Sequence, residues 1–315
     1  MKIGLDMMGG DFAPLEAAKG IKKYVKHNAN PAHLVLIGNE EQVNICLNEL
    51  QIDPSSYTLI HASQVIDMHE HPTKALKEKT DSSIAIGFHL LASGKTDAFI
   101  SAGNTGAMMV GSLFSIKPIE GVLRPSIGAY MPRENGHNGW LMDVGLNADC
   151  KPENLVQFAI LGSLFVQHVW NVDSPKVALV NIGEEEGKGN LLTQAAYPLL
   201  KDCDKINFIG NVEGRDIFLD KADVMVCEGF TGNVILKLAE SFYDLTKRRN
   251  VEDPFFDKFN FEQYGGVPVL GINKPVIIGH GISGEEAFCN MIQMAEKMIR
   301  TDLLEKIKSN FVTSM

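Results

Sequence analysis

The sequence is poor in cysteine, has no long unbroken apolar run and carries fewer basic than acidic residues. Its five cysteines are odd in number, widely spaced and form no CxxC pair, which is typical of free thiols in a reducing compartment. The 29 Lys and Arg against 39 Asp and Glu give a net charge of −10, which excludes broad neutralisation of nucleic-acid phosphates. The remaining composition, 45% hydrophobic and 22% charged over 315 residues, is that of a globular protein.

Signals for secretion and for membrane insertion are missing as well. The start, MKIGLDMMGGDF, has acid and glycine where a signal peptide needs an apolar stretch. Two uncharged runs, 98–116 and 154–172, contain Ser, Asn, Gln or His, so neither supplies the roughly 20 apolar residues of a membrane span. We therefore expect a cytoplasmic protein.

Short apolar runs alternate with segments of helical period along the chain. This alternation predicts a three-layer α/β/α sandwich with a largely parallel sheet, in one large domain of two halves. Runs 127–131 and 139–143 flank a turn-rich stretch and are expected to form an antiparallel hairpin. Strands are expected at 2–6, 34–38, 58–61, 97–101, 127–131, 139–143, 176–181, 205–210, 223–227 and 275–279. Helices are expected at 13–27, 40–51, 82–92, 106–114, 152–169, 190–201, 232–246 and 285–308.

Six strand ends run into loops rich in glycine, asparagine, serine or acid. In a parallel sheet such loops lie on one edge, where open α/β sheets bind ligands. Glycine lets backbone N–H groups approach an anion, and a helix that starts there favours negative charge. We therefore expect a ligand that carries phosphate. The loops are 6–11, 101–107, 143–147, 181–190, 228–233 and 279–284.

The last loop matches GxGxxG at Gly279, Gly281 and Gly284. A dinucleotide fold also needs a following strand and an acidic residue about 20 positions further on. Here a long predicted helix fills the rest of the chain, so NAD is not the expected ligand.

Three other features can be explained either by a structural role or by a functional one. The His-Glu-His motif at 69–71 resembles part of a metal site, but no third ligand is identifiable nearby, which favours a solvated loop. Cys227 is either a nucleophile or, as is commoner, a buried thiol at the end of an apolar strand. The basic run 247–249 either caps a helix or docks an acidic partner.

A series of eight motifs resembles, in order, the PlsX-type phosphate acyltransferases of bacterial glycerolipid synthesis. The series spans residues 3 to about 295 and consists of DMMGGDFAP, SAGNTGA, DVGLN, NIGEEEGKGN, FIGNVEGRDI, CEGFTGNVILK, YGGVPVLG and GHGIS. The resemblance implies transfer of a fatty acyl group from acyl carrier protein to inorganic phosphate. The product, an acyl phosphate, would serve a downstream membrane acyltransferase that acylates glycerol 3-phosphate. The resemblance also implies an isocitrate-dehydrogenase-like fold shared with phosphotransacetylases, a mixed ten-stranded sheet with interlocked halves, and a homodimer.

Two residues are the best candidates for catalysis, and the resemblance points to both. Lys188 is a cation between glycines, and Asn233 is an amide at a predicted helix start. The non-catalytic alternatives are a solvated loop lysine for Lys188 and an N-terminal helix cap for Asn233. The phosphate dianion is already a nucleophile at neutral pH, so a strong general base is not expected to be needed. No cofactor or metal is expected either. The residues expected to cradle phosphate are Gly9, Gly10, Asp11, Ser101, Asn104, Thr105 and His280, with Asp143 and Asn147 as organisers.

The sequence departs from the family in two places. The last loop has Ile282-Ser283-Gly284 where the family usually has a Ser-Ser pair followed by Asn or Asp, so one hydroxyl is missing. The segment 247–264 is short but holds Phe255, Phe256, Phe259 and Phe261, which are expected to contact either the inner face of the membrane or a second subunit.

Two other functions remain open at this point. One is a short-chain phosphotransacetylase that acts on coenzyme A thioesters, and the other is a non-catalytic module that binds acyl groups or carrier protein. An apolar groove beside the glycine-rich edge would favour a fatty-acyl protein over a short-chain enzyme.

Overall fold

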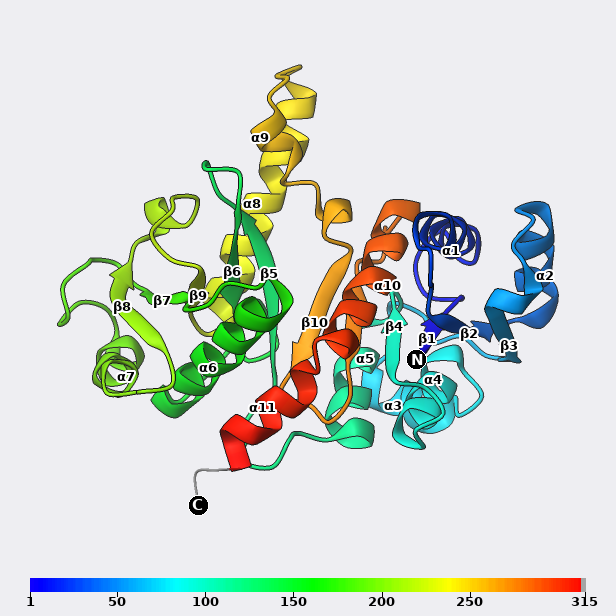
Figure 1. Ribbon diagram of the computed structural model, residues 1–315, viewed down its shortest axis with the longest axis horizontal. Coiled ribbons are helices and arrows are strands. Elements are labelled where there is room, and N and C mark those ends of the chain that lie inside the picture. Colours follow the sequence, from blue (N-terminus) through cyan, green and yellow to red (C-terminus); the bar gives the residue numbers. More distant parts are fainter. Residues whose placement is uncertain (313–315) are drawn as a thin grey trace. The chain divides into compact units, whose positions relative to one another are not determined.

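The computed structural model describes residues 1–312, which form two units (Figure 1). Unit 1 comprises residues 1–118 and 261–304, and unit 2 comprises residues 119–260 and the chain from 305 onward. Each unit therefore takes two separate stretches of the chain. None of the helices in residues 1–312 has the length and apolar character that crossing a bilayer requires.

Unit 1 contains six strands in the order β3-β2-β1-β4-β11-β10. All neighbours are parallel except β10, which is antiparallel to β11. β1, β2 and β4 are buried along almost their whole length, as parallel strands covered on both faces are. The carboxyl ends of β1, β4 and β11 therefore meet at one edge. The strands are β1 (Lys2–Asp6), β2 (His33–Gly38), β3 (Tyr57–His61), β4 (Ala98–Ser101), β10 (Gly266–Leu270) and β11 (Val276–Gly279).

Helices cover both faces of this sheet. Figure 1 shows α1, α2 and α10 on one side and α3, α4 and α5 on the other. Gly87 lets α4 approach the sheet closely, because a Cβ there would lie 2.2 Å from the ring of Phe99. The helices are α1 (Leu15–His27), α2 (Glu40–Glu49), α3 (Pro72–Glu78), α4 (Ser83–Ala92), α5 (Thr105–Gly111), which continues as one π turn (Ser112–Ile116), and α10 (Glu285–Arg300).

Unit 2 contains five strands in the order β5-β6-β9-β7-β8. The expected hairpin is confirmed, since β5 is antiparallel to β6, and the other pairs are parallel. Trp140 of β6 is fully buried and stacks on Phe165 at 4.1 Å between ring centroids. The elements are β5 (Ser126–Pro132), β6 (Asn138–Met142), α6 (Pro152–Val169), β7 (Lys176–Val180), α7 (Leu191–Lys201), β8 (Asn207–Val212), β9 (Val224–Val226), α8 (Gly229–Arg248), α9 (Pro254–Asp257) and α11 (Leu303–Val312).

The α/β class is confirmed, with eleven strands in residues 1–312 instead of the ten expected. The extra strand is β10, whose Pro268 cannot donate to a ladder and weakens the strand signal in the sequence. The helix expected over 285–308 is two helices, because Asp302 adopts a left-handed conformation at φ +51° between α10 and α11. The stretch after the His-Glu-His motif is helix α3, which Pro72 opens at its first position.

Candidate active site

The sequence-predicted site residues fall into two groups, one in each unit. In unit 1, the loops that follow β1, β4 and β11 start from one edge of the sheet. A buried carboxylate organises the first two loops: Ser101 Oγ donates to Asp6 Oδ2 at 2.6 Å, and the Met8 N–H donates to Asp6 Oδ1 at 2.9 Å. Burial raises the pKa of Asp6, while these hydrogen bonds act in the opposite direction. Asp6 was not among the predicted site residues.

Glycine is required where these loops meet. A Cβ at Gly9 would lie 2.6 Å from both Asp6 Oδ2 and the Gly103 nitrogen, and Gly10 has a φ of +98°. The N–H of Asp11 donates to the carbonyl of Gly281 at 2.8 Å, which joins the first loop to the last. Close backbone packing therefore explains these glycines, whether or not a ligand binds there.

The other predicted residues of unit 1 differ in their exposure and in the contacts that they make within the protein. Thr105 is exposed at the start of α5. His280 lies with its ring 5.0 Å from that of Phe261. Asn104 is buried and fully used by the protein: its Oδ1 accepts from the N–H of Ala107, and its Nδ2 donates to three carbonyls of the segment 67–70. Asn104 therefore anchors a neighbouring loop.

The start of α10 is occupied by two carboxylates. The N–H of Gly284 donates to Glu262 Oε1 at 3.0 Å, and the N–H of Glu285 donates to Glu16 Oε2 at 2.9 Å. These side chains place negative charge where the sequence suggested that the GHGIS loop receives an anion. Protein carboxylates therefore satisfy two N–H groups at this helix end.

In unit 2, a second buried carboxylate shapes the loop 143–147. Asp143 accepts from the N–H groups of Gly145 (2.7 Å), Leu146 (2.8 Å) and Asn147 (3.1 Å), and from Asn147 Nδ2 (2.6 Å). Burial raises the pKa of Asp143 against these hydrogen bonds. Asn147 Nδ2 also donates to the carbonyl of Pro125 at 2.8 Å, so both side chains hold the loop in place.

The start of α8 packs directly on this loop. The N–H of Gly229 donates to the carbonyl of Asn147 at 2.7 Å, and a Cβ at Gly232 would lie 1.8 Å from the carbonyl oxygen of Asp143. Asn233 is exposed, and its Nδ2 donates to the carbonyl of Val144 at 3.1 Å. This bond fixes the amide and leaves its second N–H available to a ligand.

Lys188 lies in the loop that follows β7, the parallel neighbour of β9. The carboxyl ends of β6, β9 and β7 therefore bring the loops of Asp143, Asn233 and Lys188 to the same edge of unit 2. Buried Asn181 donates to the carbonyl of Lys188 at 3.1 Å and so holds the loop backbone. Lys188 itself is exposed and makes no ion pair within residues 1–312.

The two groups share a local sequence pattern. Residues 101–107 (SAGNTGA) align without a gap with residues 227–233 (CEGFTGN) through a common Gly-x-Thr-Gly. Each segment lies at the carboxyl end of a strand, opens a helix and lies beside a buried aspartate, Asp6 or Asp143, at the carboxyl end of the parallel neighbouring strand. Comparing the strand-end loops with one another would have revealed this correspondence and the place of Asp6.

The His-Glu-His motif does not form a three-ligand cluster within residues 1–312. No group of three or more His, Cys, Asp or Glu in residues 1–312 is placed to hold a metal ion. In the His-Glu-His motif, Glu70 pairs with Lys79 at 2.6 Å and His71 precedes the first turn of α3.

Comparisons with known proteins identify the family of the chain. Residues 1–248 and 248–306 match the family model described as "Fatty acid synthesis protein". A phosphate acyltransferase of Dictyoglomus turgidum is 42% identical, with 98% of this chain and 96% of that protein covered. A phosphate acyltransferase of Halothermothrix orenii is 43% identical, with 98% of both chains covered.

Solved structures show the same fold. A phosphotransacetylase from Streptococcus pyogenes has a TM-score of 0.66 at 19% identity, covering 95% of this chain and 94% of that one. The EutD phosphotransacetylase from Staphylococcus aureus has a TM-score of 0.64 at 19% identity, covering 94% of each chain. The phosphotransacetylase-like fold expected from the sequence is therefore confirmed. Together with the family match, these results show that the chain is an acyltransferase that belongs to the PlsX family of phosphate acyltransferases.

Proposed function

We propose that the protein transfers a fatty acyl group from an acyl carrier protein thioester to inorganic phosphate, and that the acyl phosphate formed serves glycerol 3-phosphate acylation. The proposal depends on two exposed groups at the same edge of unit 2. One is an ammonium group that makes no ion pair in the described residues, and the other is an amide held by a hydrogen bond. Lys188 and Asn233 supply these groups from the carboxyl ends of adjacent parallel strands. The names of the relatives support phosphate as the acceptor.

The proposed reaction needs positioning more than proton transfer. A phosphate oxygen attacks the thioester carbonyl, the C–O bond forms, and the carbonyl electrons move onto the oxygen. The free N–H of Asn233 donates to this oxyanion, and the Lys188 ammonium offsets the negative charge that phosphate brings. The oxyanion electrons then re-form the carbonyl as the C–S bond breaks. The pantetheine sulfur leaves as thiolate and takes, through water, the proton that hydrogen phosphate loses on acylation.

The unit 1 loops are proposed to hold phosphate. Their contribution is backbone N–H groups around Gly9 and Gly10, the exposed hydroxyl of Thr105 and the ring of His280. In this proposal Ser101 and Asn104 act by shaping the loops, since their side chains hydrogen-bond to Asp6 and to residues 67–70.

The direct test is incubation with palmitoyl carrier protein and phosphate, followed by mass detection of palmitoyl phosphate and assay of released thiol. Acetyl-coenzyme A and palmitoyl-coenzyme A are tested in parallel, and Lys188→Ala provides the background rate. We expect palmitoyl phosphate in amounts equal to released thiol. Turnover of acetyl-coenzyme A alone would establish the short-chain phosphotransacetylase instead. Turnover of palmitoyl carrier protein without any acyl phosphate would contradict phosphate as the acceptor.

A further inference from the structure

Large apolar side chains lie exposed at the glycine-rich edge of unit 1. Phe12 is 54% exposed, Met68 is 40% exposed and Ile282 is 47% exposed. Each belongs to a loop that also carries, or is anchored by, a residue of the proposed phosphate site. We call these three residues the edge cluster.

Backbone contacts hold the three loops of the edge cluster together. The hydrogen bond from the Asp11 N–H to the Gly281 carbonyl joins the residues that directly precede Phe12 and Ile282. A Cβ built at Gly281 would lie 3.0 Å from Met68 Cε, so the methyl group of Met68 packs against this glycine. Gly281 is thus the point where the three loops meet.

Hydrogen bonds fix the backbone of the segment 67–70, which carries Met68. Asn104 Nδ2 donates to the carbonyls of Asp67 (2.8 Å), Met68 (3.3 Å) and Glu70 (3.1 Å). Glu70 Oε2 accepts from the N–H of Asp67 at 2.8 Å and from Lys79 Nζ at 2.6 Å. A buried amide of the SAGNTG loop therefore holds an apolar side chain in place beside the glycine loops.

We propose that Phe12, Met68 and Ile282 bind the hydrocarbon chain of the acyl donor next to its carbonyl and set the preference for long over short acyl groups. The inference rests on the proposed function, because an acyl carbonyl under attack by phosphate must lie beside the phosphate-holding loops. Phe12 is two residues from Gly10, Ile282 is two residues from His280, and Met68 is tethered by Asn104. The chain attached to that carbonyl therefore leaves the site over the edge cluster.

The chemistry of the cluster fits a hydrocarbon occupant. Phenylalanine and isoleucine supply apolar area, and the unbranched thioether of methionine adapts to irregular or variable shapes. Carboxylates lie around this edge: Asp11 Oδ1 lies 3.8 Å from a Cβ built at Gly281, and Glu262 and Glu16 accept backbone hydrogen bonds at the start of α10. None of the three residues carries a positive charge that could pair with an anionic occupant.

The test compares acyl carrier protein thioesters of four, eight and sixteen carbons in wild type and in Phe12→Ser, Met68→Ser and Ile282→Ser. We expect each variant to lower kcat/KM for the sixteen-carbon donor about tenfold and to change that for the four-carbon donor less than twofold. The matched control is Ile45→Ser, since Ile45 is 52% exposed on α2 of the same unit, away from the glycine loops. Its chain-length ratio should equal that of wild type.

Equal loss for all chain lengths would overturn the proposal and indicate carrier docking or a disturbed site, because every donor shares the carrier. An unchanged ratio would overturn it as well. A second measurement does not need turnover: binding of a non-hydrolysable sixteen-carbon amide analogue of the carrier substrate, compared with its four-carbon counterpart. If wild type forms no acyl phosphate but binds the long analogue through the edge cluster, the proposed function fails and the acyl subsite stands. If wild type turns over and the variants keep the wild-type preference for the sixteen-carbon over the four-carbon analogue, only the subsite fails.

Discussion

At the scale of single residues, Lys188 keeps an unpaired charge although three glutamates precede it in the sequence. Glu184 pairs with Lys221 at 2.7 Å, and Glu186 pairs with Lys201 at 3.1 Å. Both acids are therefore engaged by lysines outside the loop. Because Glu184 and Glu186 pair with these lysines and not with Lys188, the Lys188 ammonium is available to an anionic ligand.

We expect Lys188→Ala and Asn233→Ala each to lower kcat about a hundredfold or more, the usual loss when one donor to an oxyanion is removed. The measurement is the initial rate of acyl phosphate formation, with thermal melting to show that the fold persists. Lys176→Ala and Asn207→Ala are matched controls, because these residues lie at the amino ends of β7 and β8 in the same unit. A variant of Lys188 or Asn233 with wild-type turnover and melting would remove that residue from the catalytic proposal.

The cysteines give a second prediction at this scale. Burial raises the pKa of Cys150 to about 11 and raises that of Cys227 well above its usual value. A raised thiol pKa lowers the thiolate fraction, which for Cys150 at pH 8 is about one in a thousand. We therefore expect both thiols to react with a disulfide reagent at pH 8 far more slowly in the native protein than in the unfolded one, where all five titrate.

The same experiment addresses the nucleophile alternative for Cys227. Cys227→Ser should keep its activity, since a protonated, fully buried thiol is poorly suited to attack a thioester. Fast native labelling of Cys227, with parallel loss of activity that substrate prevents, would contradict this expectation.

The sequence was sufficient to predict which loops carry the candidate residues, because parallel strands place their carboxyl ends together whatever their order. It was not sufficient for the partners of those residues. Glu16 and Glu285 are 269 positions apart, and Asn104 reaches carbonyls 34 to 37 positions away. Such contacts depend on the tertiary fold, and no local spacing reports them.

At the scale of elements, the start of α8 depends on backbone-to-backbone contact with the loop 143–147. We expect Gly232→Ala to destabilise the protein by about 3 kcal/mol or more, because its Cβ would lie 1.8 Å from a carbonyl oxygen of a buried loop. The measurement is urea unfolding. Gly214→Ala is the control, since no heavy atom lies within 4 Å of its added Cβ. Equal midpoints for the two variants would show that α8 shifts without cost.

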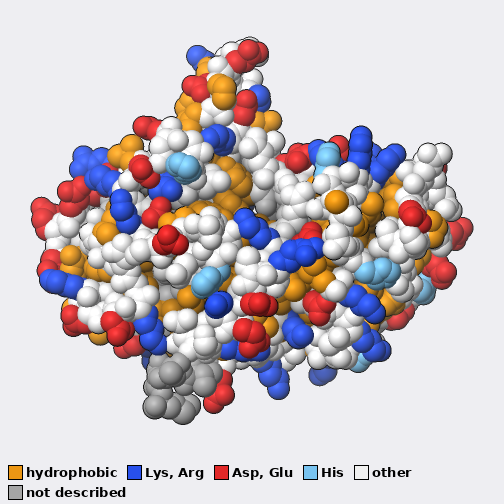
Figure 2. All heavy atoms as spheres, in the orientation of Figure 1, with side chains coloured by type: hydrophobic (Ala, Val, Ile, Leu, Met, Phe, Trp, Pro, Cys, Tyr) orange, Lys and Arg blue, Asp and Glu red, His pale blue; other side chains and the backbone are white. Residues whose placement is uncertain are grey.

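Part of the Phe-rich segment 247–264 packs into a cluster of aromatic side chains within unit 2. Phe259 is only 5% exposed and packs at 5.2 Å from Phe218 and 5.5 Å from Phe242. Phe255 and Phe256 are half-buried at its outer side, in α9. Of the four phenylalanines expected to make contacts outside the chain, Phe259 is therefore unavailable. Figure 2 shows apolar side chains along the α8–α9 region and charged ones at its tip.

We expect wild type to sediment with anionic vesicles at low salt and Phe255→Ser/Phe256→Ser to sediment less, since each phenylalanine that enters an apolar phase gains roughly 1.5–3 kcal/mol. Light scattering measures the mass of both proteins in parallel. A variant that loses mass instead of lipid binding would assign the segment to contact with a second subunit, and failure of wild type to sediment would end the membrane proposal.

Elements with strong periodicity were predicted within a few residues, and the misses have local causes. β10 carries a proline, begins at Gly266 and follows Gly265, so its sequence favours a turn although pairing with β11 makes it a strand. α3 is only seven residues long, which is too short for an apolar period to be recognised.

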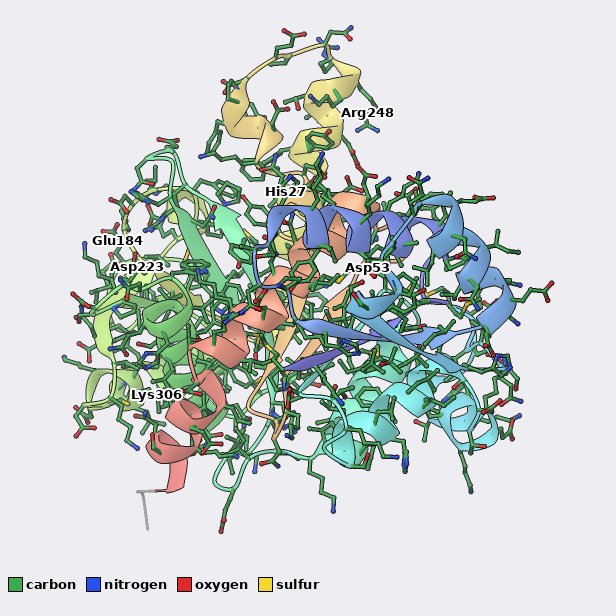
Figure 3. The ribbon with its side chains drawn as sticks, turned by 45° about the vertical axis from the view of Figure 1, so that its right-hand side comes forward. His27, Asp53, Glu184, Asp223, Arg248 and Lys306 are labelled. Atoms are coloured by element: carbon green, nitrogen blue, oxygen red, sulfur yellow. The ribbon has the colours of Figure 1, made fainter. Side chains whose placement is uncertain are left out.

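At the scale of the whole molecule, the net charge of −10 opposes approach of an acidic carrier protein, so docking needs a local positive surface. Figure 2 shows charges of both signs interspersed on the face it displays. Within unit 2, Lys247 is paired with Asp257 at 2.8 Å, whereas Arg248 and Arg249 are exposed and make no ion pair in residues 1–312. Figure 3 shows Arg248 at the far end of α8.

We expect Arg248→Glu/Arg249→Glu to raise KM for the carrier substrate severalfold at low salt and little at high salt, because screening weakens long-range attraction. Lys22→Glu/Lys26→Glu on α1 changes net charge equally and serves as the control. Identical salt profiles for the two double variants would assign the effect to net charge alone.

The division of unit 1 into two stretches of chain has a consequence for biosynthesis. β4 ends at Ser101, but its partner β11 begins at Val276, 175 positions later. At about 5–20 residues per second, a ribosome needs roughly 10–35 s to deliver that partner. During this interval the nascent chain carries an open, apolar strand edge, which other chains can pair with. The wait lengthens whenever translation slows within residues 102–275, so we expect codon choice there to influence the yield of folded protein.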